Sequence, residues 1–124
     1  MALSADPYAA GCRSRQVIDR IGDRWTGLLL GALSDGPKRF TELARRVEGI
    51  SQKMLTQTLR GLERDGMVSR TVYATVPVRV DYELTDLGRT LTAPIAALEA
   101  WARDHLDDVI AARKRYDEQA AGTG

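Results

Sequence analysis

The stretch KRFTELARRVEGISQKMLTQTLRGLERDGMV, residues 38–68, decides the fold. Its apolar side chains recur at helical spacing in two runs, which are separated by a turn at Gly49. Ser51 follows this turn and is a residue type that caps the first turn of a helix, whereas Asp65-Gly66 is typical of a helix end. The stretch therefore predicts two short helices joined by a tight turn. Their buried faces are expected to be Phe40, Leu43, Ala44 and Val47 in the first helix, and Met54, Leu55, Leu59 and Leu62 in the second.

The flanking segments complete the predicted architecture. Upstream, two further runs of apolar residues at helical spacing predict two more helices. The turn-forming residues 34–37 separate these helices from the central stretch. Downstream, residues 68–75 and 79–84 are rich in β-branched and aromatic side chains, which favours a β-hairpin with Val76-Pro77-Val78 at its tip, where a proline need not donate to the ladder. This is a mainly α fold with a β-hairpin wing (α+β), a winged helix-turn-helix. The apolar faces of the upstream helices are expected to be Val17, Ile18 and Ile21, and then Trp25, Leu28, Leu29, Ala32 and Leu33.

A final amphipathic helix is predicted after the hairpin. Thr85 is its expected cap, and Pro94 predicts a kink or break around Ala93 because proline lacks an amide proton and crowds the preceding turn. From Arg113 onward the chain turns polar and is expected to fray. The apolar stripe of this helix is expected to be Leu87, Leu91, Ile95, Leu98, Trp101, Ala102 and Val109.

Length and composition describe an ordinary globular chain. Its 124 residues fit one hydrophobic core, and 44% apolar with 28% charged residues exclude the disordered and fibrous classes. No stretch approaches the roughly 20 apolar residues of a membrane span, and no apolar core precedes Cys12 as an export signal requires. We therefore expect a cytoplasmic protein.

The residue types that carry catalysis or bind metals are scarce. One cysteine, Cys12, cannot form an internal disulfide, and with one histidine, His105, a single chain cannot assemble a zinc site. The sequence contains no phosphate-binding glycine loop and no Gly-x-Ser-x-Gly elbow. We therefore expect no metal, no cofactor and no enzymatic activity.

Charge is distributed unevenly along the chain although the net charge is only +1. Residues 36–80 carry nine Lys and Arg against four Asp and Glu, whereas residues 81–124 carry five against nine. A basic centre beside an acidic end is typical of a DNA-reading module joined to a segment that does not face DNA.

The outward face of the second central helix is predicted to read DNA. Glutamine pairs with adenine, arginine and lysine pair with guanine, and threonine contacts the thymine methyl group. No acidic residue interrupts this face before Glu63, although an ordinary solvated helix face would look similar. The face and its cap are expected to consist of Ser51, Gln52, Lys53, Thr56, Gln57 and Arg60.

Three further cations are expected to bind the phosphates that flank the groove. Lys38 and Arg39 stand at the start of the preceding helix, and Arg79 stands at the hairpin tip. Arg79 is alternatively expected to enter the minor groove. The remaining arginines of the region are interpreted as surface charges outside the site: Arg45, Arg46, Arg64 and Arg70.

The chain also resembles a known family, the HxlR-type winged-helix regulators of the MarR-like superfamily. The resemblance spans Cys12 to Trp101, and it implies a bacterial transcription factor that dimerises through its first and last helices. We expect a repressor that binds a pseudo-palindromic operator of double-stranded DNA, with two recognition helices about 34 Å apart. The runs that carry the resemblance are DRW at 23–25, KRFTEL at 38–43, ISQKMLTQTL at 50–59, LERDGMV at 62–68, VDYELT at 80–85, and Trp101.

The apolar residues of the final helix point to the same assembly. They form more apolar surface than the last helix of a small monomer easily hides. They are therefore the expected dimer interface: Leu87, Leu91, Leu98 and Trp101.

The resemblance implies a sensor role for Cys12. Some family members sense oxidants or electrophiles through a cysteine at the start of the first helix, and Cys12 matches this position. A helix N-terminus with Arg13 and Arg15 nearby favours the reactive thiolate, although Arg13 stands where similar sequences commonly carry proline. Two alternatives remain open: a regulator controlled by a small-molecule effector with Cys12 inert, and a winged helix that contacts only protein.

These expectations divide the chain into segments of a single domain, residues 1–124. Residues 1–12 form an N-terminal arm and residues 38–84 the DNA-binding core and wing. Residues 85–112 form the dimerisation helix, and residues 113–124 the frayed tail.

Overall fold

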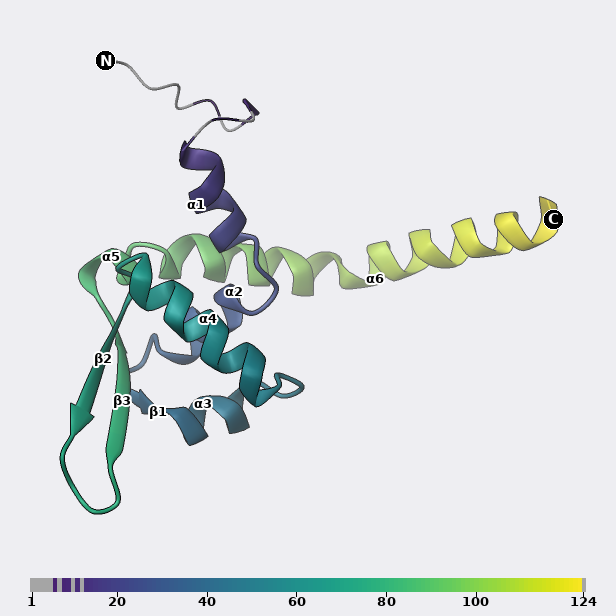
Figure 1. Ribbon diagram of the computed structural model, residues 1–124. Helices are drawn as coiled ribbons and strands as arrows, with labels where there is room; N and C mark the ends of the chain where they lie inside the picture. Colours follow the sequence, from purple (N-terminus) through teal and green to yellow (C-terminus); the bar gives the residue numbers. More distant parts are fainter. Residues whose placement is uncertain (1–5, 7, 10, 12, 124) are drawn as a thin grey trace. The chain divides into compact units, whose positions relative to one another are not determined.

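The computed structural model describes residues 6, 8, 9, 11 and 13–123. The chain divides into two compact units, residues 1–92 and residues 93–124, and each is described by itself. In order, the elements are α1 (Arg13–Ile21), α2 (Thr26–Ala32), β1 (Lys38–Arg39), α3 (Phe40–Arg46), α4 (Gln52–Arg64), β2 (Val68–Tyr73), β3 (Arg79–Leu84), α5 (Asp86–Arg89) and α6 (Thr92–Thr123) (Figure 1). The predicted winged helix-turn-helix is confirmed.

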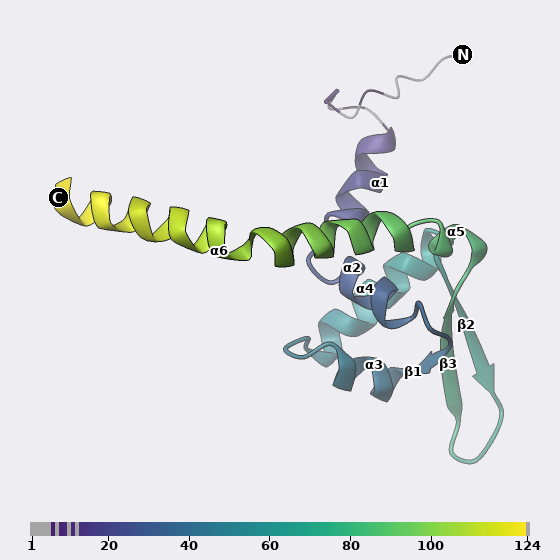
Figure 2. The ribbon, with the colours of Figure 1, turned by 180° about the vertical axis from the view of Figure 1, so that it is seen from behind.

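A leucine-rich core holds α2, α3 and α4 together. Figure 2 brings α2 to the front, between α1 and α3. Each of the three core helices turns leucines inward, and Met67, Val68 and Leu84 extend the core to the sheet. Truncating one such leucine to alanine typically costs about 2–5 kcal/mol. The fully or nearly fully buried leucines are Leu29, Leu30, Leu33, Leu43, Leu55, Leu59 and Leu62.

The buried face of α4 differs from the prediction at one position. Met54, expected in the core, is 37% exposed, and Thr58 is buried instead. Residues 55, 58, 59 and 62 lie on one stripe of an α-helix, whereas Met54 is about 100° away from Leu55. The Thr58 hydroxyl donates to the Met54 carbonyl at 2.8 Å, which satisfies this buried polar group.

The other predicted faces also expose some apolar residues. Ala44, Val17, Ile18 and Leu28 lie at the surface rather than in the core. No residue of α1 is buried, so the first helix is a peripheral element of its unit.

The ends of α4 are as the sequence predicts. Ser51 caps the helix by accepting a hydrogen bond from the Met54 amide at 3.0 Å. Gly49 in the preceding turn has φ +89° and Gly66 after the helix has φ +77°, which are backbone conformations that favour glycine. The turn and the stop therefore fix where α4 begins and ends.

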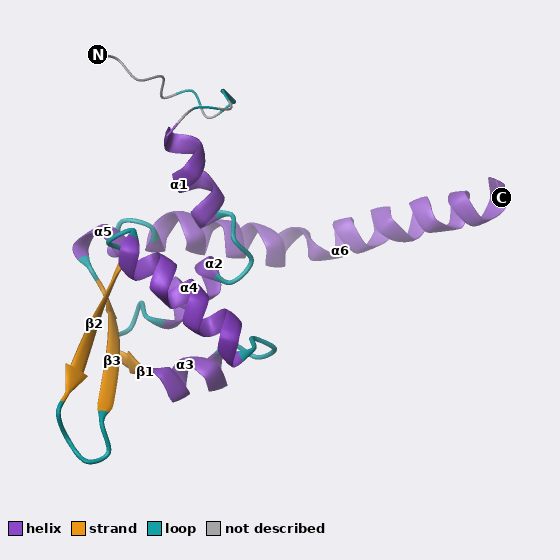
Figure 3. Ribbon diagram, in the orientation of Figure 1, coloured by secondary structure: helices purple, strands orange, loops and turns teal. Residues whose placement is uncertain are grey.

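Within the described residues, the strands form a three-stranded antiparallel sheet in the order β1-β3-β2 (Figure 3). The hairpin runs in register from Val68 opposite Leu84 to Tyr73 opposite Arg79. β1 was not predicted, because two residues are too short to show alternation. It is recognisable only through its pairing with β3, where Arg39 lies opposite Asp81.

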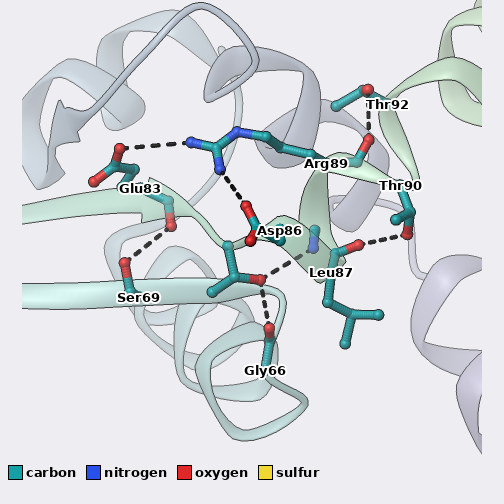
Figure 4. Close-up of polar contacts among 10 residues, drawn as sticks. Gly66, Ser69, Glu83, Asp86, Leu87, Arg89, Thr90 and Thr92 are labelled. Atoms are coloured by element: carbon teal, nitrogen blue, oxygen red, sulfur yellow. Dashed lines mark hydrogen bonds and ion pairs between the residues drawn. The ribbon is translucent and has the colours of Figure 1, made fainter.

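A polar network closes the hairpin end farthest from the tip (Figure 4). The Thr85 hydroxyl donates to the Gly66 carbonyl at 2.6 Å and accepts from the Gly88 amide at 3.1 Å. Arg89 contacts Glu83 at 3.6 Å and Asp86 at 3.1 Å. Thr85 is thus a helix cap, as predicted, but it caps the short α5 rather than the last helix.

The break before the last helix lies earlier than predicted. The chain leaves α5 at Thr90 and Leu91, and Pro94 is the third residue of α6. A proline in the first turn breaks no helical hydrogen bond, because the first amides of a helix have no partner within it. The prediction of a break around Ala93 was therefore wrong by about three residues.

α6 continues to Thr123 through the segment expected to fray. Alanine, arginine, lysine, glutamate and glutamine dominate residues 111–121, and all of them favour helix. Despite this length, neither α6 nor another helix of the described residues is apolar enough to cross a membrane.

Candidate DNA-binding surface

The polar face predicted on α4 forms one continuous surface. Gln52, Lys53, Gln57 and Arg60 are exposed and Thr56 is half-buried. All five line a common shallow depression along the helix. The sequence therefore predicted correctly which side of α4 faces solvent, and what this surface binds stays a prediction.

A hollow of about 440 Å³ separates α4 from the wing. Phe40, Val80 and Tyr82 contribute its apolar part, and the remaining lining residues are polar or charged. The lining residues of α4 are Gln52, Thr56, Arg60 and Glu63, and that of β2 is Arg70.

Arg70 lines this hollow, although the sequence predicts it to be a surface charge outside the site. It lies opposite Tyr82 in the hairpin, and cross-strand partners point to the same face of a sheet. Val80 and Tyr82 alternate along β3 and both face the hollow. Once the hairpin register pairs Arg70 with Tyr82, Arg70 is placed on the same face. Without a register, Arg70 is one more surface arginine.

A second hollow, of about 530 Å³, lies between the start of α3 and the hairpin tip. Arg39 and Arg79 both line it, so the structure brings these two predicted cations together. The backbone amide of Arg39 donates to the Glu42 carboxylate at 3.0 Å, which caps α3 and leaves the Arg39 side chain exposed.

Asp81 fixes the orientation of Arg79. Arg79 Nε and Nη2 donate to the two carboxylate oxygens of Asp81 at 2.9 and 2.8 Å, and its guanidinium lies 5.0 Å from the centre of the Tyr73 ring. The hydrogen bonds to Arg79 lower the pKa of Asp81 and raise the pKa of Arg79. The Asp81 side chain is 13% exposed and that of Arg79 is 45% exposed. The carboxylate is thus covered while the cation remains accessible.

Lys38 precedes Arg39 in β1 but lines a different hollow from the other predicted cations. Its ammonium group donates to Asp35 at 2.6 Å, and this hydrogen bond lowers the pKa of Asp35. Lys38 lines a third hollow with Glu42, Arg45 and Arg46, and none of the α4 contact residues reaches that hollow. The structure therefore does not bring Lys38 to the α4 surface.

The other predicted site residues have clear positions or lie outside the described residues. The Ser51 hydroxyl is engaged in capping α4. Cys12 lies outside the described residues. Of the four residues expected at a dimer interface, Leu87, Leu98 and Trp101 are exposed and Leu91 is half-buried. In the described part of the chain, no three His, Cys, Asp or Glu side chains are placed to hold a metal ion.

Comparison with known proteins identifies close relatives. The model of the HxlR-like helix-turn-helix family matches residues 20–110. The HTH-type transcriptional regulator YtfH of Escherichia coli is 43% identical over 114 residues, which make up 92% of this chain and 88% of the relative.

Solved structures agree with this match. The transcriptional regulator ytfH of Salmonella typhimurium superposes with a TM-score of 0.83 at 42% identity, over 88% of this chain and 97% of the other. The redox regulator HypR in its reduced form superposes with a TM-score of 0.73 at 41% identity, over 79% of this chain and 97% of the other.

Proposed function

The chain belongs to the HxlR-like helix-turn-helix family, and from this premise we propose that it binds a specific site in double-stranded DNA as a homodimer. Its relatives are named transcriptional regulators, so the chain is a helix-turn-helix transcriptional regulator and not an enzyme. The observation that carries the DNA-binding proposal is the α4 surface. Five groove-reading side chains share it, and it continues across a hollow to the wing.

In this proposal α4 enters the major groove. Gln52, Gln57 and Arg60 contact base edges, where each good bidentate pair discriminates by about 1–3 kcal/mol. The backbone of one DNA strand passes between α4 and the wing, where Arg70 binds its phosphates. Ser51 contributes by fixing the start of the helix, and so the positions of the residues that follow it.

The wing binds DNA through two arginines at its tip. Arg39 and Arg79 share a hollow and are both accessible, so they reach the phosphates beside the groove or the minor groove itself. The contribution of Lys38 is smaller, because its charge is paired with Asp35 and it lines a hollow that contains no residue of α4 or of the hairpin tip.

Dimerisation supplies the second recognition helix. Leu98 is 65% exposed and Trp101 57% exposed, and Leu87 is also exposed. Large apolar side chains at such exposure are typical of residues that a partner covers, and we propose that this partner is a second copy of the chain. A two-fold dimer presents its α4 helices to successive major grooves, which requires a pseudo-palindromic operator.

We further propose that the protein is a cytoplasmic repressor that oxidants or electrophiles inactivate through Cys12. Support comes from the similarity to HypR, which is named a redox regulator, and from the position of Cys12 just before α1. A gel shift with diamide or a quinone tests it: the wild-type protein is expected to release operator DNA, and a Cys12→Ser variant to stay bound. Release by both proteins would remove Cys12 from the mechanism, and release by neither would favour a small-molecule effector as the signal.

Selection from a library of randomised DNA duplexes tests the central proposal. We expect a pseudo-palindromic site, an affinity that falls steeply with salt, and a loss of about 1–3 kcal/mol in operator binding for Gln52→Ala or Arg60→Ala. Arg64→Ala is the matched control, because it removes an exposed charge one turn further along α4, beyond both hollows. Equal binding by Arg60→Ala and wild type would show that the assigned face is wrong. Absence of any salt-dependent DNA binding would favour a protein-contact module.

A further inference from the structure

Arg20, in the last turn of α1, joins this helix to the C-terminal end of α4. Its Nε donates to Asp65 Oδ2 at 2.9 Å, and Asp65 is the residue that follows α4. Both side chains are partly buried. Asp65 is part of a predicted helix end and of one family run, whereas Arg20 has no predicted role, and none of the DNA contacts proposed above involves either residue.

Gly61 allows the Arg20 guanidinium to lie directly against the backbone of α4. A Cβ at position 61 would lie 2.5 Å from Cζ, Nη1 and Nη2 of Arg20, closer than side-chain atoms pack. Glycine is unfavourable inside a helix, so its presence in the tenth position of a thirteen-residue helix is explained by this close approach. A cation here also interacts favourably with the C-terminal end of the helix dipole. We name Arg20, Gly61 and Asp65 the α1–α4 clasp.

The clasp matters because α1 has few other anchors. No residue of α1 is buried, and Val17 and Ile18 are each half exposed. Packing restrains a helix without buried side chains only weakly. The partly buried ion pair, which fits closely against Gly61, therefore contributes much of the interaction that sets the position of α1 relative to α4.

We propose that Arg20 is a positioning residue for DNA binding: through Gly61 and Asp65 it fixes the C-terminal end of α4 and transmits displacements of α1 to the DNA-facing end. This inference rests on the proposed binding of DNA by α4. Gln52 is nine residues from Gly61, or about 13 Å along a helix that rises about 1.5 Å per residue. A tilt of about 5° at the clasp therefore moves Gln52 by about 1 Å, more than the roughly 0.5 Å that a precise binding site tolerates.

The substitution Gly61→Ala separates positioning from stability. An added methyl group displaces the end of a flexible arginine rather than backbone, so the protein is expected to fold, and alanine favours the helix. The thermal midpoint should be unchanged or higher. The ratio of affinities for the selected operator and for a scrambled duplex should nevertheless fall about three- to tenfold.

Arg20→Ala is the second variant, with Arg64→Ala as the control for the loss of one positive charge at the same end of α4. Arg20→Ala should reduce the same affinity ratio as Gly61→Ala, and the double variant should be no worse than either, because both remove one clasp. The dependence of affinity on salt should not change, since Arg20 is not a phosphate contact. Arg64→Ala should keep the wild-type ratio.

The outcomes distinguish this inference from the proposed function. If wild-type protein prefers its operator and Gly61→Ala has the same preference, the positioning role is refuted while DNA binding stands. If Arg20→Ala lowers the affinity for both duplexes equally and flattens the salt dependence, Arg20 is a phosphate contact and the inference is wrong. If the wild-type protein has no preferred duplex, the proposed function itself fails.

Discussion

The substitution Asp81→Asn tests whether the ion pair with Asp81 limits the positive charge that Arg79 presents to DNA. Asp81 binds Arg79 through two hydrogen bonds of 2.8 and 2.9 Å and is largely covered, so it both orients the cation and neutralises it. Asparagine keeps the size of the side chain and removes its charge. The variant protomer thus presents one additional unpaired cation to DNA.

The magnitude follows from counterion release. Each additional phosphate contact steepens the slope of log K against log salt by about 0.9, so between 0.05 and 0.2 M salt the variant should lose about 3.5-fold more affinity per protomer than wild type. Affinity for scrambled DNA at low salt should rise. Preference for the operator should fall, because Arg79 loses the bidentate partner that fixes its direction.

Fluorescence anisotropy with labelled operator and scrambled duplexes over a salt series measures both quantities. Asp104→Asn, an equal change of charge on exposed α6, is the control and should leave the slope unchanged. An Asp81→Asn slope equal to that of wild type would refute the reasoning, because it would mean that the pair does not restrain the charge of Arg79 near DNA.

Three further predictions concern stability and assembly. Gly88→Ala should destabilise folding by about 2–4 kcal/mol in a denaturant titration, because its Cβ would collide with the Met67 carbonyl, which is rigid backbone. Trp101→Glu should shift the protein to monomer in sedimentation velocity, whereas Arg103→Glu, on the opposite side of α6, should not. If both variants sedimented as dimers, the proposed interface would be contradicted. Because hydrogen bonding lowers the pKa of Asp81, its ion pair should stabilise the wing at every pH above the ordinary aspartate value, about 3.9, and this contribution should be lost as pH falls below that value. A hairpin that loses amide-exchange protection already at pH 6 would contradict this sign.

The features that the sequence predicted are those with local causes. The start of α4 depends on one hydroxyl and one amide, and its end on a glycine with positive φ. The hairpin depends on alternation within two short runs. Because these signals lie within a few residues of one another, they can be recognised without knowledge of the tertiary structure. The solvent-exposed face of α4 follows from them.

The features that the sequence missed depend on partners distant in the chain. β1 exists because Lys38 and Arg39 pair with β3, more than 40 residues away. Arg70 belongs to the surface only through its register opposite Tyr82. Thr58 takes the place expected for Met54 in the core, so the buried face of α4 is rotated slightly from the predicted one. The apolar pattern does not reveal this, because a threonine can be buried when its hydroxyl donates to a carbonyl of its own helix.

Intramolecular pairing changes what the basic charge of residues 36–80 means for binding. Of the predicted cations, Lys38 and Arg79 are bound to carboxylates, whereas within the described residues no ion pair involves Arg39, Lys53, Arg60 or the added Arg70. Cations that already have a carboxylate partner displace fewer counterions from DNA. Four unpaired cations per protomer make eight per proposed dimer and a salt slope of about −7, whereas six per protomer would give about −11. A measured slope of about −7 would indicate that the acidic residues of this unit limit sequence-independent binding. The polar side chains of α4 would then decide where the protein binds.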